Sequence, residues 1–338
     1  MDGDRGEAVG ASDDTSGFDL PAVLAQLDAT EPRRQRLAVR TIRETIDDDP
    51  SRCLPTVPKL RTILDRPSID FHTEVASCLA DLAAESAADV APSVDDLVSF
   101  AVDNERHPAT GELLRCFEAV AVERPGDVVD HADALVDIVD HRTEYDRWGL
   151  RLFATLSVDY PARVEPAVPV LTAAVAADPE RNGPAGLSAL GRIARSDATA
   201  PSLAFVDEAI PLINHEDDSL RNNAIGCLGD VAHHTPSAVE DACPRIAAVL
   251  DSADPRTRAN AAVTIARVAA GTEAAVEPAR GRLQPLLDDE YASVRANACL
   301  ALGYGRVEVA ADQLQELARE DPDETVRERA SWAVDRLG

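Results

Sequence analysis

The chain repeats itself with a period of about 37 residues, and this period constrains its fold more than any other feature. The copies align on one small or apolar position, which we term the anchor of each unit. The anchors are Ala38, Val75, Leu113, Gly149, Gly186, Ala224, Ala261, Ala298 and Ala330. A fixed period of this size predicts one supersecondary unit stacked many times, since no single unit can bury its own apolar face.

Each unit has the sequence pattern of two helices joined by a turn. In the clearest unit, residues 244–250 fit a first helix and residues 256–271 fit a second helix that Gly271 closes. Between them, Asp254 has the side chain of an N-cap, and Pro255 suits the first helical position. The apolar residues of the second helix follow the spacing of one buried stripe, so the hairpin must pack against neighbours.

The residues that end the second helix of a unit recur as well. Prolines recur twelve residues after the anchor, where the second helix should end, at Pro50, Pro125, Pro161 and Pro236. No strand pattern competes anywhere in the sequence. We therefore expect an all-α superhelix, a solenoid of about nine two-helix repeats, over residues 18–338. Residues 1–17 are acidic and rich in Gly and Ser, and they should form a disordered tail.

The composition describes the core and the surface. Apolar residues make up 45% of the chain but aromatic residues only 4%, so Ala, Val, Leu and Ile must build the core. The net charge is −28, from 61 acidic and 33 basic residues, and Lys59 is the single lysine. This acidity disfavours nucleic acids and anionic membranes as partners. Acid excess with almost no lysine also indicates a halophilic protein in a high-salt cytoplasm, where salt screens repulsion between carboxylates.

The cysteines fit core positions in a reducing cytoplasm. Three of the six, Cys78, Cys116 and Cys227, occupy the same slot three residues after the anchor, which is typical of a small core residue. No two cysteines have CxxC spacing, and no secretory segment precedes the repeats. The longest apolar runs are far too short to cross a membrane, so no membrane insertion is expected.

Three stretches carry a family resemblance. S-V-R-A-N-A-C-L-A-L-G (293–303), L-R-N-N-A-I-G-C-L-G (220–229) and R-T-R-A-N-A-A-V-T-I-A (256–266) resemble HEAT repeats, in particular the short type found in bilin-lyase proteins. The resemblance is specific over residues 205–338 and weaker over residues 18–204. It implies a right-handed superhelix with the second helices on the concave face. Because the family includes scaffolds, transport receptors, lyase chaperones and a few enzymes, it implies little about function.

An arginine recurs three residues before the anchor in the last four units, at Arg221, Arg258, Arg295 and Arg327. A row of guanidinium groups can grip carboxylates or phosphates of a ligand. Alternatively, each arginine can bond the acidic turn residue seven positions earlier or that of a neighbouring unit. The pairs within a unit would be Asp251 with Arg258, Asp288 with Arg295, and Glu320 with Arg327. Repetition in every unit favours this structural ladder, since repeated residues usually serve stacking.

The slot directly before the anchor varies while its neighbours stay constant, which indicates a solvated face for recognition. It holds Asn223, Asn260 and Asn297 in the late units, and Glu74, Glu112 and Trp148 in the middle units. Tyr145, Arg147 and Arg151 surround Trp148, and an exposed Trp beside Arg is a good anchor for a partner. The alternatives are that each Asn satisfies a turn of the neighbouring hairpin and that Trp148 is packed into an irregular unit. The predicted partner-binding residues are Glu74, Glu112, Tyr145, Trp148, Arg151, Asn223, Asn260 and Asn297.

No constellation for catalysis or metal binding stands out. The chain has no phosphate-binding loop, nucleophile elbow or dinucleotide fingerprint. HEAT-type metal hydroxylases carry four symmetric His-Glu pairs, whereas this chain has His215-Glu216 once. We expect no catalytic residue, no metal and no cofactor.

The sequence thus predicts a non-catalytic cytoplasmic scaffold or adaptor that binds a protein partner along the superhelical groove, around units three to five. One alternative is a HEAT-like lyase, chaperone or enzyme that acts on a small molecule or a modified protein. Another is a nucleic-acid module like the HEAT-like DNA glycosylases. Its only support is a basic patch in the first unit, formed by Arg33, Arg34, Arg36, Arg40 and Arg43. The sequence identifies neither the partner nor the oligomeric state.

Overall fold

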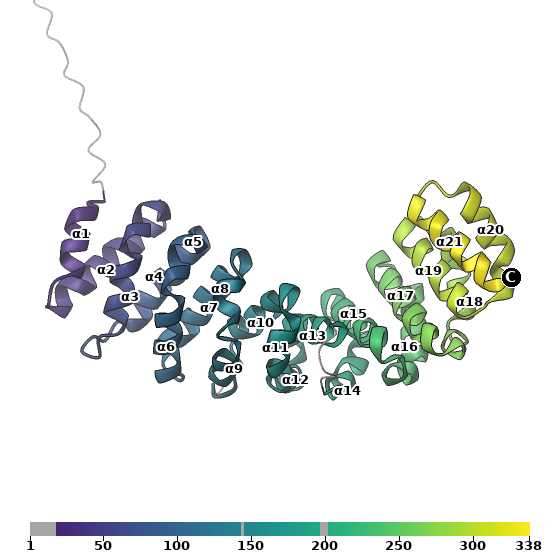
Figure 1. Cartoon of the computed structure of the whole chain (residues 1–338), viewed down its shortest axis with the longest axis horizontal. Helices are drawn as coiled ribbons and strands as arrows, with labels where there is room; N and C mark the ends of the chain where they lie inside the picture. The colour runs from purple at the N-terminus through teal and green to yellow at the C-terminus, as the bar shows by residue number, and fades with distance from the viewer. Residues whose placement is uncertain (1–17, 143–144, 197–201) are drawn as a thin grey trace, which may run out of the picture.

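The computed structural model describes residues 18–142, 145–196 and 202–338. Within these ranges the chain forms helices and turns, with no strand. Nine helical hairpins follow one another along an elongated arc, and the first and last hairpins lie at its opposite ends (Figure 1). The all-α solenoid expected from the period is therefore confirmed. The predicted tail over residues 1–17 lies outside the described residues.

Each hairpin consists of a first helix, a short turn and a longer second helix. The first helices are α1 (Leu20–Leu27), α3 (Val57–Leu64), α6 (Val94–Asp103), α9 (Ala132–Asp140), α12 (Val168–Ala177), α14 (Phe205–Ala209), α16 (Cys243–Ala248), α18 (Arg280–Leu283) and α20 (Ala311–Glu320). The second helices are α2 (Pro32–Ile46), α4 (His72–Glu85), α7 (Pro108–Glu123), α10 (Arg147–Asp159), α13 (Pro179–Arg195), α15 (Asp218–His234), α17 (Pro255–Gly271), α19 (Ala292–Tyr304) and α21 (Glu324–Leu337). In the middle of the arc, the second helices lie on its inner side and the first helices on its outer side (Figure 1).

Short helical turns connect the hairpins and extend three of the first helices. The α-helical connectors are α5 (Ala87–Val90), α8 (Gly126–Val129) and α11 (Pro161–Val164). The 3-10 connectors are η1 (Pro50–Thr56), η2 (Ala91–Ser93), η3 (Glu165–Ala167), η5 (Pro236–Ala238), η6 (Glu240–Ala242), η8 (Glu273–Val276) and η10 (Glu308–Ala310). The extensions of α14, α16 and α18 are η4 (Ile210–Asn214), η7 (Val249–Asp251) and η9 (Pro285–Asp288).

Helix α17 shows why these sequences fold locally as they do. The Asp254 carboxylate accepts hydrogen bonds from the backbone N–H groups of Arg256 and Thr257, at 3.2 and 3.0 Å. Pro255 occupies the first turn, where it removes no helical hydrogen bond. The helix ends at Gly271, as the sequence predicts.

The anchors are buried in all nine hairpins. Where the anchor is glycine, at Gly149 and Gly186, the second helix approaches the first helix of the same hairpin closely. At Gly149, an added Cβ would lie 2.5 Å from Cγ2 of Val139, so only glycine fits without movement of α9. The repeat period seen in the sequence is therefore the period of a buried position on the second helices.

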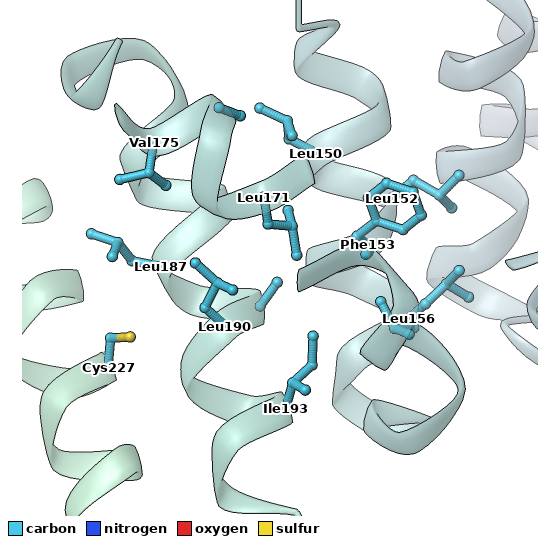
Figure 2. Close-up of a cluster of buried hydrophobic side chains, with 14 of the residues drawn as sticks. Leu150, Leu152, Phe153, Leu156, Leu171, Val175, Leu187, Leu190, Ile193 and Cys227 are labelled. Atoms are coloured by element: carbon cyan, nitrogen blue, oxygen red, sulfur yellow. The ribbon is translucent and has the colours of Figure 1, made fainter. Parts of the chain in front are cut away.

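The core runs continuously from one hairpin to the next. Figure 2 shows apolar side chains of α10, α12 and α13 meeting, with a cysteine of α15 at the left of the view: Leu150, Phe153, Leu156, Leu171, Leu187, Leu190 and Cys227. Each such aliphatic or aromatic side chain contributes about 1.5–3 kcal/mol when fully buried. Stability is thus distributed along the array, and solvated positions of the second helices remain free to serve binding.

The slot three residues before the anchor has the same structural role in most hairpins. Its side chain hydrogen-bonds the backbone carbonyl six residues earlier, in the turn of its own hairpin, whatever the residue type. The bonds join Gln35 to Ala29 (2.8 Å), His72 to Arg66 (3.1 Å), Thr110 to Asn104 (2.6 Å), Arg221 to His215 (2.7 Å), Arg258 to Ser252 (2.9 Å), Arg295 to Asp289 (2.8 Å) and Arg327 to Asp321 (2.7 Å).

The arginines of this slot also join neighbouring hairpins, but not through the carboxylates named from the sequence. Arg258 donates two hydrogen bonds to Asp289 of the next turn, at 2.8 and 3.0 Å, and Arg295 does the same to Asp321, at 2.8 and 2.9 Å. The within-hairpin pairing of Arg258 with Asp251 is wrong, since Asp251 pairs with Arg282. The reason is geometric: one guanidinium nitrogen is held by the carbonyls of its own turn, so the other two donate to the next hairpin.

A candidate partner-binding pocket at the middle hairpins

The second helices α7, α10 and α13 meet at an open cavity of about 710 Å³ near their N-terminal ends. This volume lies within the range of about 300–1,000 Å³ that is usual for ligand pockets. The lining combines two aromatic side chains with charged ones of both signs. It consists of Pro108, Gly111, Glu112, Arg142, Tyr145, Asp146, Arg147, Trp148 and Arg181. We call it the Trp148 pocket.

The approach to α10 is fixed by hydrogen bonds. The Asp146 carboxylate caps α10 by accepting from the backbone N–H of Trp148, at 2.9 Å. Arg142 lies 3.5 Å from the same carboxylate and donates to the Glu105 carbonyl of the preceding hairpin, at 2.9 Å. Gly111 makes room for this arrangement, because an added Cβ would lie 3.0 Å from the Asp146 carboxylate and 3.1 Å from the Arg142 guanidinium. The pocket wall is therefore held in place before any partner arrives.

Trp148 is half-buried. One part of its side chain packs against the hydrophobic core, and the residue also lines the pocket. The guanidinium carbons of Arg147 and Arg151 lie 4.7 and 4.9 Å from its ring centroid, within the range of cation–π attraction. Arg151 is itself held by Glu118, a buried carboxylate on α7, at 2.9 Å. The indole is thus held from several sides.

The charges around the pocket are not all compensated. Both acidic residues of the lining have cationic partners: Glu112 pairs with Arg115 at 2.8 Å, and Asp146 faces Arg142. Arg147 and Arg181 are exposed, and no carboxylate in the described part of the chain lies within ion-pair distance of either guanidinium. The pocket therefore presents two positive charges that no described carboxylate neutralises, on a protein of net charge −28.

The structure brings together only some of the residues predicted for partner binding. Glu112, Tyr145 and Trp148 line the pocket, and Arg151 lies one helical turn beyond Trp148. Glu74, on α4, is not part of its lining.

The three predicted asparagines lie in α15, α17 and α19, and their side chains bond protein groups. Asn260 donates to the Asn222 side chain at 3.2 Å, and Asn297 donates to the Ala259 carbonyl at 2.9 Å. Asn223 bonds the Ser219 carbonyl within its own helix at 2.9 Å. Asn260 and Asn297 thus link consecutive second helices rather than bonding a turn.

Titratable groups elsewhere form no reactive cluster that the structure describes. All six cysteines are buried and unpaired, and burial raises the pKa of Cys116 to about 12, which keeps that thiol protonated. In the described ranges, no group of three or more His, Cys, Asp or Glu side chains is arranged to hold a metal ion. None of the described helices is long and apolar enough to cross a membrane.

Comparisons with known proteins agree with this geometry. The family model for HEAT repeats matches residues 244–335. These hairpins are similar to HEAT repeats. The matched part covers the last three hairpins, where the sequence resemblance is specific. No curated protein matches the chain.

Solved structures share the fold at low sequence identity. A crystal structure of an engineered protein matches with a TM-score of 0.79 and 19% identity, over 93% of this chain and 87% of the other. A structure titled for a phosphorylation switch that controls the interaction between cadherin and beta-catenin matches with a TM-score of 0.75 and 13% identity, over 94% of this chain and 72% of the other. Both likenesses concern the fold alone, an all-α superhelix.

Two arginines of the pocket, Arg142 and Arg181, were not predicted from the sequence. Arg142 follows the first helix of the fourth hairpin, and Arg181 lies in the first turn of the second helix of the fifth. Neither occupies the repeated arginine slot, so the repeat pattern carries no signal for them. Only the stacking of hairpins brings Arg181 beside Trp148, 33 residues earlier in the sequence.

Proposed function

We propose that this chain is a non-catalytic protein–protein interaction scaffold whose middle hairpins hold the anchor of a protein partner. The observation that carries the proposal is the Trp148 pocket, where Trp148 and Tyr145 line an open cavity on a rigid array. Aromatic residues held by their surroundings lose little conformational freedom on binding, which is why Trp and Tyr dominate the binding energy of interfaces. The HEAT repeats and the solenoid neighbours support this function class, since such repeats commonly mediate protein–protein interactions.

Affinity capture from a native extract of the source organism tests the proposal. The Tyr145→Ala/Trp148→Ala chain is expected to lose a partner that the unmodified chain retains, whereas Tyr291→Ala is expected to keep it. Tyr291 is a suitable control because its side chain is exposed and lies at the turn before α19, far along the array. Equal recovery of every copurifying protein by all three chains contradicts the proposal.

We extend the proposal to a reducing, cytoplasmic setting. Six buried cysteines without a disulfide fit a compartment that keeps thiols reduced. Alkylation of the denatured protein, taken directly from cells, should modify all six. Protection of any pair by a disulfide contradicts this setting.

A further inference from the structure

The Trp148 pocket differs in charge from two other cavities of the protein. A cavity of about 320 Å³ beside α20 is lined by four carboxylates and no basic residue, at Asp288, Glu316, Glu320 and Asp321. Another, of about 500 Å³ beside α1, has the carboxylates of Asp19, Glu44, Asp48 and Asp49 against one arginine, Arg52. The Trp148 pocket has three arginines against two carboxylates. It is thus a basic spot on an acidic protein.

The balance inside the pocket is more positive than this count, because its carboxylates are already engaged. Glu112 forms an ion pair with Arg115. Asp146 forms an ion pair with Arg142 and caps the N-terminus of α10. What remains for a partner is the pair of exposed guanidinium groups of Arg147 and Arg181. Arginine pairs with carboxylates through two parallel hydrogen bonds, which gives both charge and directional recognition.

We infer that the Trp148 pocket binds an acidic segment of the protein partner, with carboxylates on Arg147 and Arg181 and an apolar side chain against Trp148 and Tyr145. This inference rests on the proposed function and adds the chemistry of the partner. A short acidic peptide fits better than a nucleic acid, because two isolated arginines provide no continuous basic track for a phosphate backbone. The net charge of −28 for the whole chain also disfavours a long polyanion.

The two tryptophans of the chain, Trp148 and Trp332, allow a direct optical test. In a Trp332→Phe background, Trp148 is the only indole, and its emission reports on the pocket. The ligand is an acetylated and amidated peptide of sequence Asp-Glu-Leu-Phe-Glu-Asp. Its amide isostere, Asn-Gln-Leu-Phe-Gln-Asn, and the cationic peptide Lys-Lys-Leu-Phe-Lys-Lys serve as comparisons, all at low ionic strength, because salt screens exposed ion pairs.

The acidic peptide should change the emission saturably and bind at least about tenfold more tightly than either comparison peptide. Arg147→Glu/Arg181→Glu should abolish the preference. The matched control, Arg33→Glu/Arg40→Glu, makes the same change in net charge at two exposed arginines of α2 and should leave binding unchanged. Far-UV circular dichroism and the thermal midpoint verify that each variant is folded.

Equal binding of the acidic and amide peptides, or retained preference after charge reversal at Arg147 and Arg181, overturns the inference. Tighter Arg147- and Arg181-dependent binding of duplex DNA or of a phosphoserine peptide also overturns it. Partner capture separates this failure from that of the proposed function. If the charge-reversed chain still captures a partner that the Tyr145→Ala/Trp148→Ala chain loses, the scaffold function stands and the carboxylate chemistry is wrong.

Discussion

Arg151 donates two hydrogen bonds to Oε1 of Glu118, at 2.9 and 3.2 Å, while its guanidinium lies over the ring of Trp148. Glu118 is on α7 and Arg151 is on α10, so this contact joins two hairpins and fixes the side chain that holds the indole. The most distinctive residue of the sequence is therefore supported by a carboxylate 30 positions earlier.

We expect Glu118→Gln to loosen this support. The amide keeps the shape of the side chain but loses the charge that orients Arg151, so the free energy of unfolding should fall by about 1 kcal/mol. In the Trp332→Phe background, the indole of Trp148 should also become more accessible to a neutral quencher, so its emission should be quenched more strongly. Urea unfolding and acrylamide quenching measure the two effects. Unchanged quenching would show that Arg151 does not position Trp148.

The cross-hairpin pair of Arg295 and Asp321 should stabilise the array far more than an exposed pair. The Asp321 side chain is 2% exposed, so Arg295→Met leaves a buried carboxylate without its partner and should cost about 3–5 kcal/mol. The matched control is Arg282→Met, which breaks the exposed pair with Asp251 and should cost about 0–1 kcal/mol. Denaturant unfolding checks both values. In the double variant Arg295→Met/Asp321→Asn, much of the loss should be recovered, and a loss as large as that of Arg295→Met would contradict the account.

The pH dependence of stability should include a contribution from His107. Its Nδ1 caps α7 by accepting from the backbone N–H of Ala109, at 3.0 Å, and burial together with nearby His72 lowers its pKa from 6.5. As the pH falls, His107 is therefore protonated in the unfolded chain before it is protonated in the folded chain. The stability that neutral His107 contributes is fully present above the pKa of the unfolded chain. It is lost progressively as the pH falls from there toward the lower pKa of the folded state.

His107→Asn keeps a side-chain acceptor at the N-cap but removes the titration. Thermal unfolding of the two chains at neutral and mildly acidic pH should show a smaller decline for His107→Asn. Parallel curves would mean that His107 does not contribute to the pH dependence.

Two helical glycines should respond to alanine in opposite directions. Gly149→Ala places a methyl group 2.5 Å from Val139 and should destabilise the chain by about 1–3 kcal/mol. Gly226, inside α15, has no neighbour within 4 Å of an added Cβ, so Gly226→Ala should stabilise by about 0.5–1 kcal/mol. Urea unfolding of both variants measures the difference. A destabilising Gly226→Ala would show that this position has a further constraint.

The sequence predicts what depends on local pattern and period. The anchors, the N-cap Asp254 and the helix end at Gly271 all follow from short-range rules, and the structure confirms them. The Asp289 partner of Arg258 could not be predicted, because it depends on how one hairpin is offset from the next. The residues of the pocket could be predicted only in part. Variation in the slot before the anchor pointed to Glu112 and Trp148, whereas Arg181 required the stacking geometry itself.

Photo-cross-linking from inside the pocket tests the central claim most directly. A photoreactive phenylalanine analogue replaces Tyr145, which lines the pocket, or Tyr291, which is exposed elsewhere, and the full-length chain is illuminated in native extract. We expect one protein to cross-link reproducibly at position 145, to disappear with Trp148→Ala, and to be absent at position 291. The same protein cross-linked equally from both positions, or none cross-linked from position 145, would contradict the account.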